Sequence, residues 1–190
     1  MSEALLQLRQ VGMRFSGLQA VDGLDFSVMA GQVVGLIGPN GAGKTTVFNL
    51  ITGVYRPTAG QVLWQGRDIT GAPPHQVAAL GIFRTFQTIR LFPGLSVLEN
   101  VQAGLHLQTR QRWWQGLLGT PAQRREESSQ RAQVRELLAR LNLADVADED
   151  ATSLAYGLQR RVELARALIA KPKLLILDEP AAALNDQESL

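Results

Sequence analysis

The sequence predicts an α/β fold into which a mainly helical segment is inserted. An apolar run at 33–37 leads through a glycine-rich loop into an apolar helical pattern at 47–51. A second apolar run, 174–177, is typical of a parallel strand buried on both faces, and it ends in Asp178-Glu179. Between them, residues 88–157 favour helices over strands, because their apolar positions repeat at helical spacing.

Length and composition limit the possible classes of protein. A chain of 190 residues with 45% hydrophobic residues fits a single domain, 1–190, either of medium size or with a sizeable insertion. The absence of cysteine excludes disulfides, thiol catalysis and cysteine-based zinc sites. Residues 1–4 lack the basic and apolar regions of a signal peptide, and no window approaches the length of a membrane helix. The chain is therefore expected to be soluble or peripheral to a membrane.

The first thirty residues predict antiparallel strands. Residues 5–15 alternate well enough for a short strand pair interrupted at Gly12, and 21–30 predicts a further strand. Phe15 stands beside the turn formers Ser16-Gly17. It is either a core or edge aromatic or a ring that stacks on a nucleotide base, and the residues alone favour neither.

The glycine-rich loop predicts a phosphate site. The segment 38–45 has the spacing G-x-x-x-x-G-K-T, and it lies between an expected buried strand at 33–37 and a helix, which is the context of the P-loop motif. Glycines allow backbone N–H groups to converge on phosphate oxygens, and the helix N-terminus adds a partial positive charge. Lys44 is expected to reach the terminal phosphates and the Thr45 hydroxyl to hold Mg²⁺. These features predict a P-loop NTPase core.

Short elements follow the P-loop helix. Residues 60–66 predict a strand between glycine turns, and 76–80 a short helix. Residues 82–87 alternate as a strand that ends in Gln87, at the kind of position where α/β folds bind ligands.

The insertion predicts two helices with defined starts. Ser96 and Glu99 form a capping-box pattern, and a helix is expected from Thr120 to about Leu141. The second helix should carry two ion pairs on its polar side, Glu127 with Arg131 and Glu136 with Arg140. Its apolar side is expected to consist of Val134, Leu137, Leu138 and Leu141. Trp113-Trp114 is interpreted either as a partner anchor or as internal packing of the insertion.

The carboxylates after the last apolar run predict a cation site. Two adjacent acids at the end of a buried strand are costly to desolvate without a cation. Asp178 is expected to hold Mg²⁺ through its water shell, and Glu179 to orient or deprotonate an attacking water. The alternative is that both acids cap the following helix.

Taken in order along the chain, these pieces resemble the ABC ATPases. The residues that carry the resemblance are Phe15 as the adenine-stacking aromatic, Gly38, Pro39, Asn40, Gly41, Ala42, Gly43, Lys44, Thr45 and Thr46 as Walker A, Gln87 as the Q-loop glutamine, Leu154, Ala155, Tyr156, Gly157 and Leu158 as the signature, 174–179 as Walker B, and 182–185 as the D-loop. The resemblance implies ATP and Mg²⁺ as ligands, with Thr45, Gln87 and Asp178 around the metal and Glu179 and Gln87 as catalytic residues. It implies a nucleotide-binding core at 1–87 and 158–190 and a helical subdomain at 88–157.

The local sequence at 81–87, 89–92, 95–101 and 178–182 is similar to that of the ATPases of bacterial branched-chain amino-acid importers, with urea or short-amide importers as an open alternative. The resemblance implies a second ATPase subunit, identical or different, whose ATP faces this chain's signature. It also implies transmembrane permease subunits, a solute-binding protein and a place in the cytoplasm on the inner face of the cell membrane.

Several features depart from the family pattern. Ala155 replaces the usual serine, Leu158 the usual glutamine, and Ala183 a glycine. The family's switch histidine lies beyond Walker B, and the sequence ends at Leu190, so the chain is expected to be truncated and to bind nucleotide with weak or absent hydrolysis. An impaired nucleotide-dependent interaction module and a soluble ABC protein acting on nucleic acid stay open as alternatives. The low net charge of +2 disfavours nucleic acid as a partner.

Overall fold

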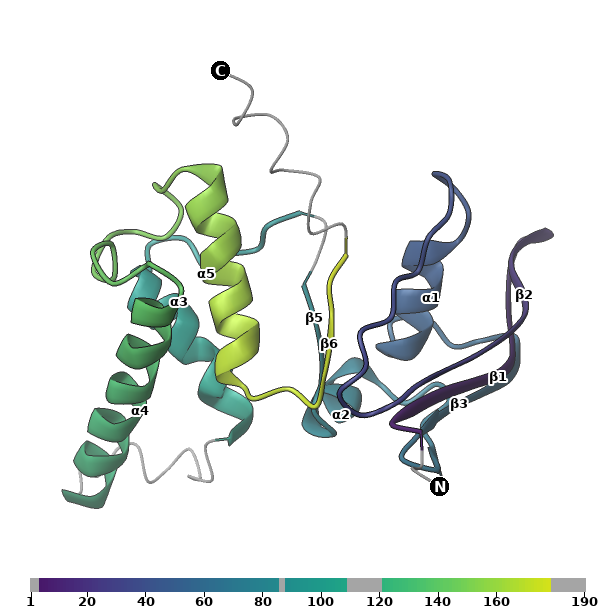
Figure 1. Ribbon diagram of the computed structural model, residues 1–190, viewed down its shortest axis with the longest axis horizontal. Coiled ribbons are helices and arrows are strands. Elements are labelled where there is room, and N and C mark those ends of the chain that lie inside the picture. The colour runs from purple at the N-terminus through teal and green to yellow at the C-terminus, as the bar shows by residue number, and fades with distance from the viewer. Residues whose placement is uncertain (1–3, 86–87, 109–120, 179–190) are drawn as a thin grey trace. The chain divides into compact units, whose positions relative to one another are not determined.

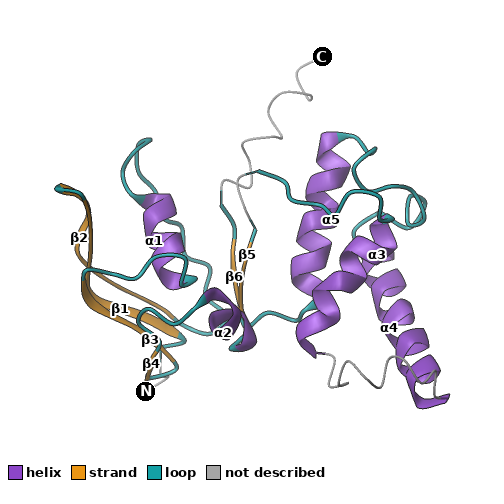
Figure 2. Cartoon of the chain, turned by 180° about the vertical axis from the view of Figure 1, so that it is seen from behind, coloured by secondary structure: helices purple, strands orange, loops and turns teal. Residues whose placement is uncertain are grey.

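The computed structural model describes residues 4–85, 88–108 and 121–178. The chain separates into two compact units, Met1–Ile82 and Phe83–Leu190. Each unit contains both helices and strands (Figures 1 and 2).

The first unit is built on a four-stranded antiparallel sheet. The strand order is β2-β1-β3-β4, and the strands are β1 Leu6–Phe15, β2 Leu18–Val28, β3 Ala59–Trp64 and β4 Arg67–Asp68. The expected antiparallel strands are thus confirmed. The prediction of a short strand pair within 5–15 is wrong, because Gly12 pairs with Ala59 and the ladder continues past it as one ten-residue strand.

A glycine sets the spacing between two of these strands. Gly60 has a φ of 80°, and a Cβ built on it would lie 2.2 Å from the backbone oxygen of Gln10. Only glycine tolerates both the positive φ and the close backbone approach. β3 can therefore lie against β1 at this point, and the alternating apolar residues Leu6, Leu8 and Val62 become buried.

Two helices accompany this sheet. Helix α1, Lys44–Ile51, buries Val47, Leu50 and Ile51, and it contacts β2. Helix α2, Pro74–Ala79, begins with proline in its first turn and buries Val77. Proline fits the first turn because the N–H that it lacks has no partner within the helix.

The expected buried strand before the P-loop is not present. Residues 33–37 form no strand, and Val33 and Ile37 are 98% and 94% exposed. A parallel strand is stable only with neighbours that satisfy its backbone and layers that cover its faces. Among the described residues of the first unit no strand pairs with 33–37, so apolar composition alone does not make this segment a strand.

The second unit combines a helical cluster with a two-stranded sheet. The elements are β5 Ile82–Arg84, α3 Val97–Gln102, the 3-10 helix η1 Ala103–Gln108, α4 Pro121–Arg140, α5 Tyr156–Ile169 and β6 Leu174–Ile176. β5 and β6 are neighbours, and just beyond β5 the Thr85 N–H donates to the Ile176 oxygen at 3.0 Å. The predicted helices at Ser96 and Thr120 are confirmed as α3 and α4.

One apolar cluster joins α3, α4 and α5. Its members come from α3, η1, α4, α5 and the loop between α4 and α5, and most are fully buried: Val97, Leu98, Val101, Leu105, Val134, Leu138, Leu143, Ala147, Ala151, Leu154, Val162, Ala165 and Ile169. Burial of this many aliphatic side chains is the main favourable contribution to the unit's stability. The helical spacing that predicts these elements also selects the residues that pack.

Strand β6 meets the prediction only in part. It is shorter than the apolar run 174–177, and Leu177 is 40% exposed. Ile176 and the acid that follows, Asp178, are buried, at 7% and 4% exposure. The carboxylate therefore does need a compensating charge, as its sequence context predicts.

Candidate functional site

The first candidate site is the loop before α1. Gly43 is the N-cap of the helix, with a φ of 82°, and a Cβ on it would lie 2.4 Å from the backbone oxygen of Ala20. Gly41 also has a positive φ, of 83°, with open space around it. Glycine at both positions allows the loop to turn tightly, because it adopts a positive φ without steric cost. Without side chains at these positions, the loop backbone is left open to an approaching ligand.

The N-terminus of α1 is available to an anion. No side chain caps the helix, and its first turn carries no acidic residue. The first N–H groups of a helix have no partner within it, and the helix dipole makes this end positive. A loop that leads into such an uncapped helix end is suited to bind phosphate.

Lys44 is held over this loop by the loop itself. Its Nζ donates to the backbone oxygens of Gly38 and Pro39 at 2.7 and 2.8 Å. These bonds place an ammonium group where the loop folds back toward the helix. The next residue, Thr45, is exposed, so its hydroxyl is accessible to a ligand or a metal ion.

Phe15 lies at the end of β1 and makes an aromatic contact. Its ring meets that of Tyr55 edge to face, with 5.3 Å between centroids. Both rings are 37% exposed. The contact is compatible with an edge aromatic and leaves part of the ring open for stacking, so the base-stacking role stays a prediction.

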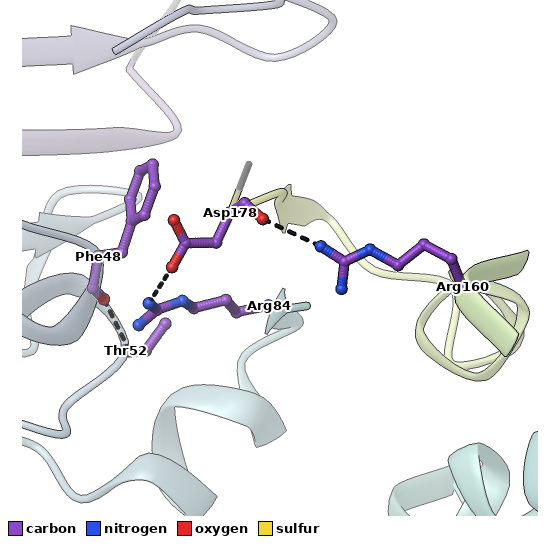
Figure 3. Close-up of polar contacts among 5 residues, drawn as sticks. All are labelled: Phe48, Thr52, Arg84, Arg160 and Asp178. Atoms are coloured by element: carbon purple, nitrogen blue, oxygen red, sulfur yellow. Dashed lines mark hydrogen bonds and ion pairs between the residues drawn. The ribbon is translucent and has the colours of Figure 1, made fainter. Parts of the chain in front are cut away.

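The second candidate site surrounds Asp178. Its Oδ2 accepts a hydrogen bond from Arg84 Nη2 at 2.6 Å, and the two side chains are only 5% exposed each. Arg160 of α5 donates from Nη2 to the backbone oxygen of Asp178 at 3.3 Å (Figure 3). Arginines from β5 and α5 thus hold the carboxylate side chain and its backbone.

The signature residues form the start of α5. Ala155 is the N-cap, Tyr156 is 50% exposed, and no atom lies within 4 Å of a Cβ built on Gly157. Like α1, the helix has no side-chain cap and no acidic residue in its first turn. Its open N-terminus is a second position with the charge and donors that suit an anion.

The two apolar signature residues instead face the helical cluster. Leu154 is buried, and Leu158 is half-buried and packs against the same cluster. Gln159 fastens the preceding loop, because its Nε2 donates to the backbone oxygens of Thr152 and Leu154 at 3.0 and 2.8 Å. Sequence reasoning did not predict this role for Gln159.

Several predicted residues lie outside the described residues: Gln87, Glu179, the D-loop 182–185 and Trp113-Trp114. Sequence reasoning missed Arg84 and Arg160 as partners of Asp178. Arg84 lies 94 positions from Asp178 in the chain, so no local spacing reveals the pair. The available signal was the buried acid itself, which demands a cation from some part of the chain.

Oxygen ligands for Mg²⁺ are present in both candidate sites. Within the described ranges, no three His, Cys, Asp or Glu side chains cluster as a metal site. Mg²⁺ in nucleotide sites is usually held by one or two protein oxygens together with phosphates and water, so such a cluster is not required. The exposed Thr45 hydroxyl and the Asp178 carboxylate fit that donor chemistry.

No helix in the described part of the chain is both long and apolar enough to cross a bilayer.

Comparisons with known proteins agree on one family. The family model described as ABC transporter matches residues 21–182. The high-affinity branched-chain amino acid transport ATP-binding protein BraF of Pseudomonas aeruginosa is 45% identical over 189 residues, which cover 100% of this chain and 74% of BraF. The corresponding protein LivG of Escherichia coli K12 is 44% identical, with the same coverage. Among solved structures, MJ1267, an ATP-binding cassette of an ABC transporter, matches with a TM-score of 0.78 and 32% identity over 95% of this chain and 70% of MJ1267.

Proposed function

Because the chain belongs to the ABC transporter family, we propose that it is the ATP-binding and hydrolysing subunit of an importer for branched-chain amino acids. The observation that carries the proposal is the Lys44 ammonium, held over a glycine loop at the uncapped N-terminus of α1. The substrate class rests on the similarity to BraF and LivG, which are named as branched-chain amino acid transport proteins.

ATP binds through the loop and the start of α1 in this proposal. The N–H groups of 41–46 and the helix dipole bind the phosphates, and Lys44 exchanges its contacts with Gly38 and Pro39 for phosphate oxygens. Phe15 stacks on the base. The remaining Walker A residues, Pro39, Asn40 and Ala42, shape the turn.

Hydrolysis requires groups near the terminal phosphate. Thr45, Gln87 and Asp178 would hold Mg²⁺, which when bound neutralises charge on the phosphates. Glu179 orients or deprotonates the attacking water, and Gln87 positions it. Gln87 and Glu179 lie outside the described residues, so both roles are assigned from the sequence.

The signature residues 154–158 serve ATP bound by a second subunit. Support comes from the open N-terminus of α5, which offers N–H donors and positive dipole charge. The proposed assembly contains a second ATPase subunit, transmembrane permease subunits and a solute-binding protein, with this chain on the inner face of the cell membrane. Within the chain, 1–87 and 158–190 are proposed as the nucleotide-binding core and 88–157 as the helical subdomain.

The phosphate site is tested by replacing Lys44. Loss of a charged donor to phosphate should weaken ATP binding by about tenfold to a hundredfold in Lys44→Ala, since a hydrogen bond to a charged group contributes roughly 1.5–3 kcal/mol. Isothermal calorimetry measures the affinity. Lys173→Ala is the matched control, because Lys173 is exposed and lies outside the loop. Unchanged affinity in Lys44→Ala would contradict the phosphate site.

The importer role is tested in proteoliposomes. The chain is co-expressed with the permease subunits of a branched-chain amino acid importer, and the complex is reconstituted with a solute-binding protein for these amino acids. We expect ATP-dependent uptake of leucine, isoleucine and valine, abolished by Lys44→Ala. Uptake of urea or a short amide without uptake of these amino acids would reassign the substrate and keep the ATPase role.

A further inference from the structure

Asp178 forms an ion pair with a positively charged residue of the same chain, Arg84. Its Oδ2 pairs with Arg84 at 2.6 Å, and both side chains are 5% exposed. A carboxylate this deeply buried is costly without a partner, and a buried pair that loses one member is strongly destabilised. Arg84 therefore neutralises Asp178.

The same carboxylate is the proposed protein ligand for Mg²⁺. A guanidinium and a metal ion both require its negative charge, and two cations close together repel each other. Binding of Mg²⁺ with nucleotide at Asp178 must therefore weaken or replace the contact with Arg84.

A second acceptor lies near Arg84. Glu163 of α5 is 3% exposed, and its Oε1 is buried without a hydrogen-bond partner among the described residues. Its other oxygen, Oε2, accepts from Arg160 at 2.8 Å. Arg160 also donates to the Asp178 backbone oxygen, so its guanidinium group links Glu163 to Asp178.

An open pocket gives Arg84 room to move. Arg84 and Glu163 both line it, together with Phe83, Phe92, Gly104 and Arg166, and its volume is about 230 Å³. Arg166 lies over the Phe92 ring, 5.3 Å from its centroid. Glu163 Oε1 is a buried oxygen without a hydrogen-bond partner among the described residues, and it belongs to a residue that lines the same pocket as Arg84. A guanidinium group that donates to this oxygen would therefore be favourably placed.

We propose that Arg84 is the resident counter-ion of Asp178 and that it yields this carboxylate to Mg²⁺, turning toward Glu163 Oε1 as the nucleotide binds. This inference rests on the proposed function, because it assumes that Asp178 meets Mg²⁺. Arg84 is a positioning residue in this scheme. It sets how strongly Mg²⁺ improves nucleotide binding, and Glu163 stabilises the state in which Mg²⁺ is bound.

The test measures ATP affinity by calorimetry with Mg²⁺ and with EDTA, and takes the ratio as the Mg²⁺ effect. In Arg84→Gln no guanidinium competes, so the Mg²⁺ effect should rise by about tenfold, with little change in affinity under EDTA. The nucleotide-free variant should also melt several degrees lower, and Mg²⁺-ATP should restore more of that loss than in the original chain. In Glu163→Gln the second acceptor is weakened, and the Mg²⁺ effect should fall.

Arg140→Gln is the matched control. It breaks an arginine–carboxylate pair of the same 2.6 Å length, but one whose side chains are 72% and 65% exposed. Neither the melting temperature nor the Mg²⁺ effect should change, because exposed pairs contribute little.

Three results would overturn the inference. One is a Mg²⁺ effect in Arg84→Gln equal to that of the original chain, which would leave Arg84 a purely structural role. Another is a Glu163→Gln variant that binds Mg²⁺-ATP as the original chain does. If Arg84→Gln does not fold, Arg84→Lys carries the test, since a single ammonium group holds a carboxylate less firmly than a guanidinium fork, and an unchanged Mg²⁺ effect there counts against the proposal. Absence of ATP binding in the original chain would instead contradict the proposed function.

Discussion

The side-chain oxygen of Asn100 accepts a hydrogen bond from the Phe92 N–H at 2.8 Å, and its Nδ2 donates back to the Phe92 oxygen at 3.2 Å. The same Nδ2 lies 3.1 Å from the backbone oxygens of Leu95 and Ser96. Asn100 is fully buried in α3, so one amide group satisfies the backbone of the loop that leads into this helix.

Replacing this amide should destabilise the second unit. Asn100→Leu keeps a similar volume but removes the partner of the Phe92 N–H and of the Phe92 oxygen, at a cost of about 2–4 kcal/mol in unfolding free energy. Chemical denaturation followed by circular dichroism measures the loss. Gln133→Leu on the exposed side of α4 is the control and should change stability by less than about 0.5 kcal/mol. Equal effects of the two substitutions would show that the Asn100 bonds are not needed.

Two glycines of the second unit should respond oppositely to alanine. A Cβ on Gly104 would lie 2.2 Å from the Arg166 oxygen and 2.6 Å from Ile169 Cγ2, because η1 packs closely on α5. Gly104→Ala is expected to cost about 1–3 kcal/mol through overpacking. Gly157→Ala meets nothing within 4 Å, and alanine favours helix, so stability should hold or rise slightly. Urea denaturation of both variants decides the matter, and a stable Gly104→Ala would contradict the close packing.

Acid should weaken the capping box at α3. The Ser96 N–H and hydroxyl both donate to Glu99 Oε2, at 2.8 and 2.9 Å, and these bonds lower the pKa of Glu99 below its ordinary value of 4.5. A carboxyl whose pKa is lower in the folded state stabilises the protein above about pH 4.5, and this contribution is lost as the pH falls through the lowered value.

The measurement is the melting temperature at neutral pH and at progressively lower pH. Ser96→Ala removes the cap and should lower the melting temperature at neutral pH, with a smaller difference from the original chain once Glu99 is protonated. Hydrogen bonds from the Thr152 hydroxyl and backbone N–H lower the pKa of Asp150 in the same way. The stabilisation by Asp150 is therefore also lost in acid, and Thr152→Ala serves as a parallel variant. A difference in melting temperature between Ser96→Ala and the original chain that does not change with pH would show that the ionisation of Glu99 does not contribute to the cap.

The features of this structure that depend on residues close together in the chain could be predicted from the sequence. The capping box at Ser96 and the apolar side of α4 depend on residues three or four positions apart, and both were confirmed. The predicted Glu136–Arg140 pair is present for the same reason, and the predicted Glu127–Arg131 pair involves a side chain outside the described residues. The P-loop glycines adopt the positive φ that their motif demands at Gly41 and Gly43.

Features that depend on distant partners were not predictable. The apolar run 33–37 is typical of a buried strand, but a strand exists only if neighbours pair with it. Asp178 was predicted to need a cation, and its sequence could not show that the cation is Arg84. Leu158, which departs from the family pattern, packs against the helical cluster, and the sequence alone does not indicate this contact.

That packing leads to a prediction about the signature. Leu158→Gln replaces a half-buried apolar side chain with one whose polar end can still reach water, so the cost should be about 1 kcal/mol. Leu143→Gln in the same cluster, at a fully buried position, is the control and should cost about 3 kcal/mol or more. Denaturant titration compares the two.

Measurements of ATP binding and hydrolysis distinguish a packing role of Leu158 from a role in the signature. In the proposed assembly the signature serves ATP held by the second subunit, so Leu158→Gln should leave the ATP affinity of the isolated chain unchanged. In the assembled pair the added amide can donate a hydrogen bond near that ATP, and hydrolysis should increase. A loss of stability equal to that of Leu143→Gln, with no gain in hydrolysis, would mean that Leu158 is solely a packing residue of the helical cluster.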